Sequence, residues 1–282
     1  MTRPVILVSN DDGVHAPGIV ALAAALAPLG RVFTVAPATE QSATSHSMSL
    51  SRPLRLQRLS STRFAVDGTP ADSVYVALHL RELLPARPAL VVSGINHGLN
   101  LGSDVFYSGT VAAAREGALR GVPSIAVSMA RSADLSVVGA IARDIARNVL
   151  AQRVPPAGQT LLLNVNVPAG RVRGVRATGL GERLYDDIVE IRHDPRGQQY
   201  LWIGGPNVSH PPSKGADTEA YEAGWASVTP LGLDLVRTDM MPIAQRAAEA
   251  VLIASSRTSG RRSANGGTVV RPVKTKAPRR RP

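Results

Sequence analysis

Residues 5–19 read V-I-L-V-S-N-D-D-G-V-H-A-P-G-I, and they carry the clearest signal of the fold class. Its first five residues are typical of a buried strand, and the alanine-rich segment after Pro17 predicts a helix that ends near Gly30. A strand followed by a helix is the first half of a βαβ unit, which belongs to a parallel sheet. Two adjacent acids, Asp11 and Asp12, stand where the strand leaves the core. The stretch therefore predicts a parallel sheet with two carboxylates at one edge.

The alternation of apolar runs and amphipathic segments continues through the first half of the chain, as expected for an α/β fold with a doubly wound, mostly parallel sheet. Strands are predicted at Val5–Ser9, Val32–Ala36, Leu90–Ser93, Ser124–Ser128 and Leu161–Val165. Helices are predicted at Pro17–Leu29, Pro70–Leu84, Gly109–Arg120 and Leu135–Gln152. Thr69 is the predicted N-cap of the second helix, and alternating residues between Met48 and Asp67 predict a small hairpin ahead of it.

The C-terminal half of the chain has a different pattern. Helical periodicity stops near Gly170, and glycine, proline and short strand-like runs such as Q-Y-L-W-I-G dominate up to Val228. We expect a core over residues 1–169, followed by β-hairpin extensions and a C-terminal helix over residues 170–253. These hairpins either serve as oligomerisation arms that pack on a neighbouring subunit or form a second small β-lobe on the same chain.

The net charge of +11 comes largely from the C-terminal end of the chain. Residues 254–282 hold nine Lys or Arg and no acid, which leaves 23 basic and 21 acidic residues before them. This end also lacks aromatic residues, so a disordered basic tail is predicted. Such a tail is solvated or binds polyanions weakly, and no specific nucleic-acid partner is expected.

The 282 residues include no cysteine, which excludes disulfides, thiolate metal sites and cysteine nucleophiles and favours a reducing compartment. The apolar run after Pro4 is too short for a signal peptide, and no stretch approaches the roughly 20 apolar residues of a membrane span. We therefore expect a cytoplasmic protein without a membrane partner.

Polar loops follow three of the predicted strands. Asp11 and Asp12 end the first strand, A-P-A-T-E-Q-S-A-T-S-H-S follows the second, and S-G-I-N-H-G-L-N-L-G follows the strand at Leu90. The carboxyl ends of parallel strands meet at one edge of the sheet, where ligands bind. Two close carboxylates raise each other's pKa, and a hard cation such as Mg²⁺, Mn²⁺ or Ca²⁺ removes that cost. The alternative is an N-D-D-G turn whose aspartates cap the following helix.

The other two loops offer neutral oxygen ligands for such a cation. Ser42 is the natural candidate in the second loop. Its competitors in the same loop are Thr44, Ser45 and Ser47. Asn96 follows a predicted strand directly, and its amide oxygen suits a hard ion. Asn100 and His97 are candidates for substrate contacts.

A predicted helix start supplies a feature that binds phosphate. In Y-S-G-T-V-A-A-A-R-E-G, Ser108 is the predicted N-cap, and the backbone N–H groups at Gly109 and Thr110 face whatever lies in front of the helix. A phosphate can bind to these N–H groups and to a cation at the same time. A cation next to this helix start therefore predicts hydrolysis of a phosphomonoester by water. The catalytic residues are then Asp11 and Asp12, as metal ligands and with one of them as general base.

Two titratable residues near these motifs are expected to have structural roles. Glu116 lies two turns into the same helix and is expected to pair with a neighbouring arginine rather than reach the metal. His46, in the second loop, either assists the reaction or holds its loop, and the second role is favoured.

The motifs resemble those of the SurE family, stationary-phase survival proteins that are 5′/3′-nucleotidases. The resemblance rests on V-S-N-D-D-G-V-H-A-P-G-I, the S-A-T-S loop, G-T-P-A-D-S-V and S-G-I-N-H-G-L-N-L-G-S-D-V-F-Y-S-G-T-V-A-A-A-R-E-G, and it extends to about Leu235.

The resemblance implies a Rossmann-like core, one divalent cation per subunit, Mg²⁺ or Mn²⁺, and hydrolysis of nucleoside 5′-monophosphates. It also implies 3′-monophosphates and short polyphosphate as further substrates, and homodimers or homotetramers with exchanged C-terminal arms. The positions that match the metal ligands are Asp11, Asp12, Ser42 and Asn96. The positions expected to bind substrate are Asn10, Asn96, Asn100, Ser108, Gly109 and Thr110.

Three other functions fit parts of the pattern. A nicotinamide-dependent oxidoreductase shares the coarse fold but needs a glycine-rich first loop that this chain lacks. A phosphatase with an aspartyl-phosphate intermediate uses D-x-D rather than adjacent aspartates. A non-catalytic nucleotide- or RNA-binding protein would act through the basic tail, and deletion of residues 254–282 separates it from the enzyme.

Overall fold

The computed structural model describes residues 3–152, 160–185, 188–204 and 208–249, so the predicted tail at 254–282 lies outside the described residues. One unit runs up to Leu233, and a second begins at Asp234. The described part of the second unit holds η2 (Thr238–Met240) and helical residues 241–249. None of the helices in these ranges is long and apolar enough to cross a membrane.

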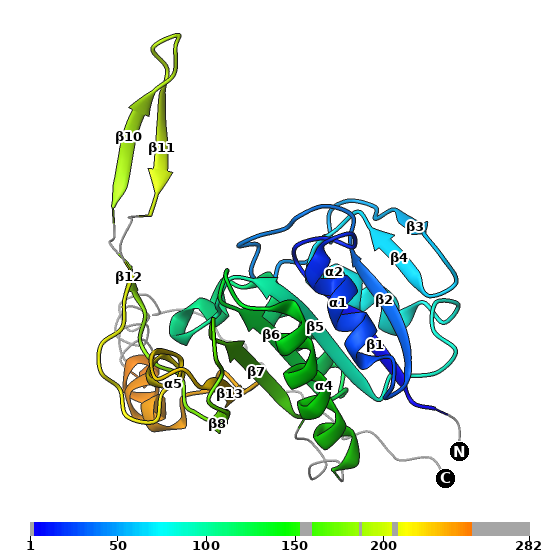
Figure 1. Cartoon of the computed structure of the whole chain (residues 1–282). Helices are drawn as coiled ribbons and strands as arrows, with labels where there is room; N and C mark the ends of the chain where they lie inside the picture. Colours follow the sequence, from blue (N-terminus) through cyan, green and yellow to red (C-terminus); the bar gives the residue numbers. More distant parts are fainter. Residues whose placement is uncertain (1–2, 153–159, 186–187, 205–207, 250–282) are drawn as a thin grey trace, which may run out of the picture. The chain divides into compact units, whose positions relative to one another are not determined.

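Strand β1 (Val5–Ser9) is buried throughout and pairs with a parallel strand on each side. It belongs to a nine-stranded sheet with the order β3-β4-β2-β1-β5-β6-β7-β13-β8 (Figure 1). The other strands of this sheet are β2 (Arg31–Pro37), β3 (Leu56–Arg58), β4 (Arg63–Val66), β5 (Leu90–His97), β6 (Ser124–Met129), β7 (Leu162–Val167), β8 (Val175–Ala177) and β13 (Ala226–Pro230). All pairings from β4 across to β7 are parallel, which confirms the predicted fold class.

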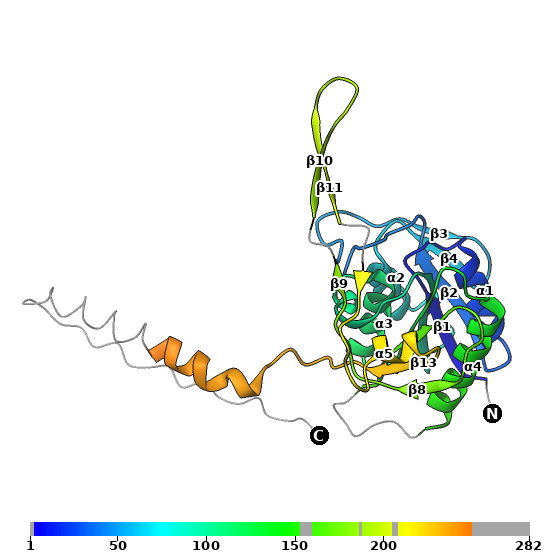
Figure 2. The same cartoon turned by 60° about the vertical axis from the view of Figure 1, so that its left-hand side comes forward.

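Helices cover both faces of the sheet. The four long helices are α1 (Pro17–Leu26), α2 (Pro70–His79), α3 (Gly109–Leu119) and α4 (Leu135–Ala151). Because side chains alternate along a strand, Ile6 and Val8 of β1 pack with α1 and α4, whereas Val5 and Leu7 pack with α2 and α3. Figure 2 shows α1 and α4 on one side of the sheet and α2 and α3 on the other.

The predicted helix starts are confirmed. Thr69 and Asp72 cap the start of α2 reciprocally. The backbone N–H of Asp72 donates to the Thr69 hydroxyl oxygen, with 3.0 Å between nitrogen and oxygen, and the Asp72 carboxylate accepts the backbone N–H of Thr69. All four predicted helices end early, α3 and α4 by a single residue and the other two by more. Helix α1 ends at Leu26 rather than Leu29, because Pro28 has no N–H to continue the hydrogen-bond ladder. Helix α2 ends at His79 rather than Leu84, and the following turn buries Leu83 against the sheet.

Two strands of the region predicted as an extension over residues 170–253 belong to the central sheet. Strand β13 pairs antiparallel with β7, and β8 pairs parallel with β13. Ala226 and Ser227 of β13 are buried, so this strand is a core element that the loss of helical periodicity after Gly170 does not reveal. Helix α5 (Asp217–Glu222) precedes β13 and packs against it.

The remaining strands of this region form two short antiparallel pairs that share no ladder with the central sheet. Strands β10 (Val189–His193) and β11 (Gln199–Ile203) form a hairpin, and β9 (Leu184–Tyr185) pairs with β12 (Val208–Ser209). Every residue of the β10–β11 ladder is exposed. The predicted hairpins are therefore present.

A buried network fastens the loop after β2 to α3. Glu116 is 2 % exposed; its Oε1 accepts a hydrogen bond from Arg120 Nε at 2.7 Å, and its Oε2 lies 2.8 Å from His46 Nε2. Burial raises the pKa of Glu116, but hydrogen bonds from His46 and Arg120 outweigh it and hold the pKa below its usual value. The predicted arginine pair is confirmed, and His46 holds its loop.

Substitution of Glu116 by Gln tests this network. Because folding lowers the pKa of Glu116, its contribution to stability is complete above the ordinary pKa of 4.5 and is lost as pH falls through the lowered value. We expect E116Q to lower the free energy of unfolding by about 1–3 kcal/mol at pH 7 and the difference from the native protein to shrink below pH 4.5. Urea unfolding at several pH values measures the loss of stability and its pH dependence. The control is E82Q, which replaces an exposed glutamate. A decrease in the free energy of unfolding that is equal at every pH would contradict the network.

Candidate metal and phosphate site

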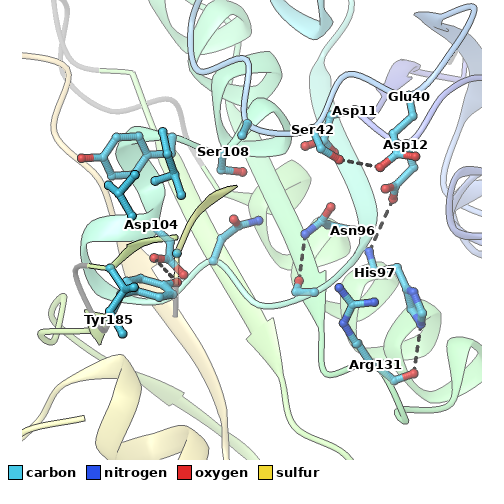
Figure 3. Close-up of a pocket in the computed structure, with 18 residues that line it drawn as sticks. Asp11, Asp12, Glu40, Ser42, Asn96, His97, Asp104, Ser108, Arg131 and Tyr185 are labelled. Carbon is cyan, nitrogen blue, oxygen red and sulfur yellow. Dashed lines mark hydrogen bonds between the residues drawn. The ribbon is translucent and has the colours of Figure 1, made fainter. Parts of the chain in front are cut away.

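The three predicted loops open on one edge of the sheet and enclose a cavity of about 900 Å³ (Figure 3). It lies at the carboxyl ends of β1 and β5, in front of α3. Seven of the predicted site residues line it: Asp11, Asp12, Ser42, Asn96, His97, Asn100 and Ser108.

Asp11 is buried against the first turn of α3. The Thr110 hydroxyl donates to Asp11 Oδ1, and Gly109 makes the approach possible, because a Cβ there would lie 2.8 Å from the Asp11 Cβ. Burial raises the pKa of Asp11 to about 6, the Thr110 hydrogen bond opposes this rise, and the nearby Asp12 adds to it. Ionised Asp11 is therefore destabilised until a positive charge approaches it.

Asp12 is half-buried beside Asp11. The backbone N–H of His97 lies 3.4 Å from Asp12 Oδ2. Burial raises the pKa of Asp12, the His97 N–H lowers it, and the Glu40 carboxylate raises it. Neither acid caps α1, whose N-cap is Ala16, so the alternative of a purely capping turn is excluded.

Ser42 lies exposed in the loop after β2, and its hydroxyl donates to Glu40 Oε1 at 2.7 Å. Ser45, with an unusual positive φ of 53°, ties the loop to the segment before α3. Its N–H donates to the Tyr107 carbonyl at 3.0 Å, and its hydroxyl to the Phe106 carbonyl at 2.7 Å. These contacts hold Ser42 in the wall of the cavity.

Asn96 lies near the end of β5, where the pairing with β6 shifts register after Ser93. Its Nδ2 donates to the Gly98 carbonyl at 2.8 Å, which leaves Oδ1 as the free acceptor of the amide. Figure 3 shows this oxygen turned toward the side of the cavity that holds Ser42. The role of this oxygen as a metal ligand stays a prediction.

Asn100 also lines the cavity, but its side chain is engaged within the protein. Its Nδ2 donates to Ser128 Oγ at 2.7 Å, and its carbonyl accepts hydrogen bonds from Asn164 at 2.8 Å and Asn166 at 3.0 Å. Asn100 therefore supports the wall through Ser128 and β7, and its predicted contact with substrate, through Oδ1 or the second N–H of Nδ2, stays a prediction. The two asparagines of β7 belong to none of the predicted site motifs, although L-N-V-N-V places both on one face of a buried strand.

Ser108 is confirmed as the N-cap of α3, because its Oγ accepts the N–H of Val111 at 3.1 Å. Gly109 and Thr110 follow it and contact Asp11 from the helix start. Asn10 is not among the residues that line the cavity: it is fully buried, and its Nδ2 donates to the Gly13 carbonyl at 2.9 Å. We interpret Asn10 as a residue that holds the N-D-D-G turn rather than one that touches substrate.

The wall opposite the acids contains residues that sequence reasoning misses. Asp104, in η1 (Gly102–Phe106), accepts a hydrogen bond from the Tyr185 hydroxyl at 2.6 Å and forms an ion pair with Arg183. Burial and the Asp104 carboxylate raise the pKa of Tyr185, so its phenol stays protonated. Asp104 and Tyr185 are 81 positions apart, and no local pattern relates them.

Comparison with known proteins agrees with this architecture. Residues 6–187 match the family model described as Survival protein SurE. The chain is 58% identical over 236 residues to the 5′-nucleotidase SurE of Sorangium cellulosum (strain So ce56), covering 83% of this chain and 91% of that one. It is 48% identical to the 5′-nucleotidase SurE of Myxococcus xanthus (strain DK1622), covering 84% and 90%.

A solved structure has the same fold. The crystal structure of the SurE protein from Aquifex aeolicus superposes with a TM-score of 0.74 at 37% identity, covering 87% of this chain and all of that one. The motif at Asp11 and Asp12, the fold and these relatives agree, and the chain belongs to the SurE family.

Proposed function

We propose that the chain is a divalent-metal-dependent phosphomonoesterase that hydrolyses nucleoside 5′-monophosphates to nucleoside and phosphate. The observation that carries the proposal is that Asp11 and Asp12 share one cavity with the start of α3. The relatives named 5′-nucleotidase support the substrate class and disfavour a non-catalytic binding protein. Nucleoside 3′-monophosphates and short polyphosphate are further proposed substrates, and the cytoplasm is the proposed location.

The donor set of the cavity fits a hard cation. Among the described residues no group of three His, Cys, Asp or Glu side chains is arranged to hold a metal, so ligands other than these types must contribute. The proposed ligands Asp11, Asp12, Ser42 and Asn96 all offer oxygen, which suits one Mg²⁺ or Mn²⁺ per subunit. The raised pKa values of both acids mark a site where a positive charge offsets an existing cost.

The residues of the cavity have complementary roles in the proposed hydrolysis. A divalent cation bound there supplies Lewis-acid polarisation and lowers the pKa of water. Asp12, the more exposed acid, orients the attacking water and takes up its proton. Thr110 holds Asp11 in place, and the first N–H groups of α3 stabilise the phosphoryl oxygens.

Hydrolysis assays with a panel of nucleoside monophosphates test this function directly. We expect release of phosphate that stops with EDTA and returns with Mg²⁺ or Mn²⁺. Asp12→Asn should lower kcat by about a hundredfold or more, because it removes both a ligand and the proton acceptor. Asp144→Asn, an exposed acid on α4, is the matched control. Near-normal turnover by D12N, or activity that EDTA leaves intact, would reject the proposal.

Asp11→Asn should stabilise the metal-free protein while it abolishes turnover. In EDTA at pH 7 the native protein carries a buried carboxylate whose ionisation opposes folding, whereas the amide is neutral and still accepts from Thr110. We expect a gain on the order of 1–3 kcal/mol in the free energy of unfolding, in line with the rise in pKa. Urea unfolding in EDTA measures this gain. A lower free energy of unfolding in D11N would show that ionisation of the Asp11 carboxylate does not oppose folding.

We also propose that the chain forms a homodimer or homotetramer through the β10–β11 hairpin. Val189 faces Ile203 and Ile191 faces Leu201 across the ladder, so these four apolar residues share one face. All four are more than half exposed. A two-stranded hairpin is marginally stable alone, and a second copy of the chain would cover this face.

Ile191→Glu combined with Leu201→Glu should reduce the oligomer to a smaller species in light scattering. Two charges on the apolar face cannot be buried against a partner without a large desolvation cost. Arg196→Glu, in the turn of the same hairpin, adds an equivalent charge outside that face and should leave the molar mass unchanged. An unchanged mass of the double variant would show that the hairpin is not the contact.

A further inference from the structure

The loop after β2 brings a third carboxylate, that of Glu40, to the cavity that holds Asp11 and Asp12. Figure 3 shows the Glu40 side chain beside Asp12 and joined to Ser42 by a hydrogen bond of 2.7 Å. Among the residues that the structure describes, no three acidic or histidine side chains are arranged to hold a metal, so Glu40 is not placed as a third acidic ligand. Its contact with Ser42 therefore has to explain its presence.

The hydrogen bond between Ser42 and Glu40 has one direction. An ionised carboxylate only accepts, so the Ser42 hydroxyl donates its single proton to Glu40 Oε1. Both lone pairs of the Ser42 oxygen then remain available to a cation. A hydroxyl without an acceptor for its proton rotates, and in some orientations the proton rather than a lone pair faces the cavity. Glu40 thus selects the orientations that suit a ligand.

The neighbouring hydroxyl groups of the loop are engaged differently. Thr44 Oγ1 donates to the Gln41 carbonyl at 2.9 Å, and Ser45 Oγ donates to the Phe106 carbonyl at 2.7 Å. Neither Thr44 nor Ser45 lines the cavity. Of these three hydroxyl residues, Ser42 alone combines a place in the cavity wall with a carboxylate that accepts its proton.

The backbone of the loop fixes where Ser42 lies. Ala43 and Ser45 have positive φ angles of 56° and 53°, which residues other than glycine rarely adopt. Such a conformation persists only where the surrounding contacts determine it. One of these contacts is the Gln41 N–H, which donates to the Asp11 carbonyl at 2.7 Å. The backbone sets the position of the Ser42 oxygen, and the direction of its proton is left to Glu40.

We propose that Glu40 is a positioning residue of the metal site, which takes the hydroxyl proton of Ser42 and so presents the Ser42 oxygen to the cation. The inference rests on the proposed metal-dependent function and adds to it a residue that acts through a ligand rather than as one. A hydrogen bond to a carboxylate also makes the donor atom a stronger electron-pair donor toward a metal. Loss of such a partner typically weakens metal binding by about 10–100-fold.

A double-mutant cycle on Mn²⁺ binding tests this role without a measurement of turnover. The Kd of Mn²⁺ is measured from the EPR signal of the free ion for the native protein, E40A, S42A and the double variant. We expect E40A to raise this Kd about tenfold in the native background. In the S42A background the same substitution should change it by less than about twofold, because the hydroxyl on which Glu40 acts is absent. Titration into the millimolar range keeps weak binding by S42A measurable.

Gln41→Ala, a truncation at the next position of the loop, is the matched control and should leave the Kd of Mn²⁺ unchanged. Because Glu40 is exposed, E40A should keep the native melting temperature in EDTA. Equal losses of affinity in the two backgrounds would show that Glu40 binds the cation itself or acts by its charge alone, and would overturn the inference. An unchanged Kd in E40A or in S42A would do the same. Failure of the native protein to bind Mn²⁺ would instead overturn the proposed function.

Discussion

The contact between the end of β1 and the start of α3 is the constraint on which the site depends. Asp11 is buried there, the Thr110 hydroxyl donates to its carboxylate, and only glycine at position 109 allows the two elements to approach so closely. The positive end of the helix dipole favours the ionised form, but burial dominates and the pKa stays raised. An ionised carboxylate in this state opposes folding in the absence of a cation, and it suits the binding of one.

Buried polar groups outside the cavity hold its other walls in one geometry. Glu116 fastens the Ser42 loop through His46, and Asp217 joins the C-terminal half of the chain to the loop after β5. Asp217 is fully buried and accepts the N–H groups of Gly102 at 2.9 Å and Gly181 at 2.8 Å. Each of these carboxylates has specific partners, so displacement of either loop would leave a buried charge without them.

The position of β1 in the sheet explains why cavities open on two sides of Asp12, one in front of α3 and one between the starts of α1 and α4. From β1 the chain first adds β2 on one side and later β5 on the other, so the strand order reverses at this point. Crossover helices then lie on both faces, and the loops diverge beyond the end of β1. The polar loops surround one cavity, while the starts of α1 and α4 enclose the more apolar one.

Much of this arrangement follows from the sequence alone. Buried runs, cap residues and polar loops predict the parallel core, the caps at Thr69 and Ser108, and the gathering of Asp11, Asp12, Ser42 and Asn96, because strand polarity places successive loops at one edge. Three features are seen only in the tertiary structure. Strand β13 pairs within the central sheet, Asn10 is buried beneath the N-D-D-G turn, and Asp104 accepts a hydrogen bond from Tyr185. These features depend on pairings between distant segments, and such pairings are decided by burial and shape, for which local patterns carry no signal.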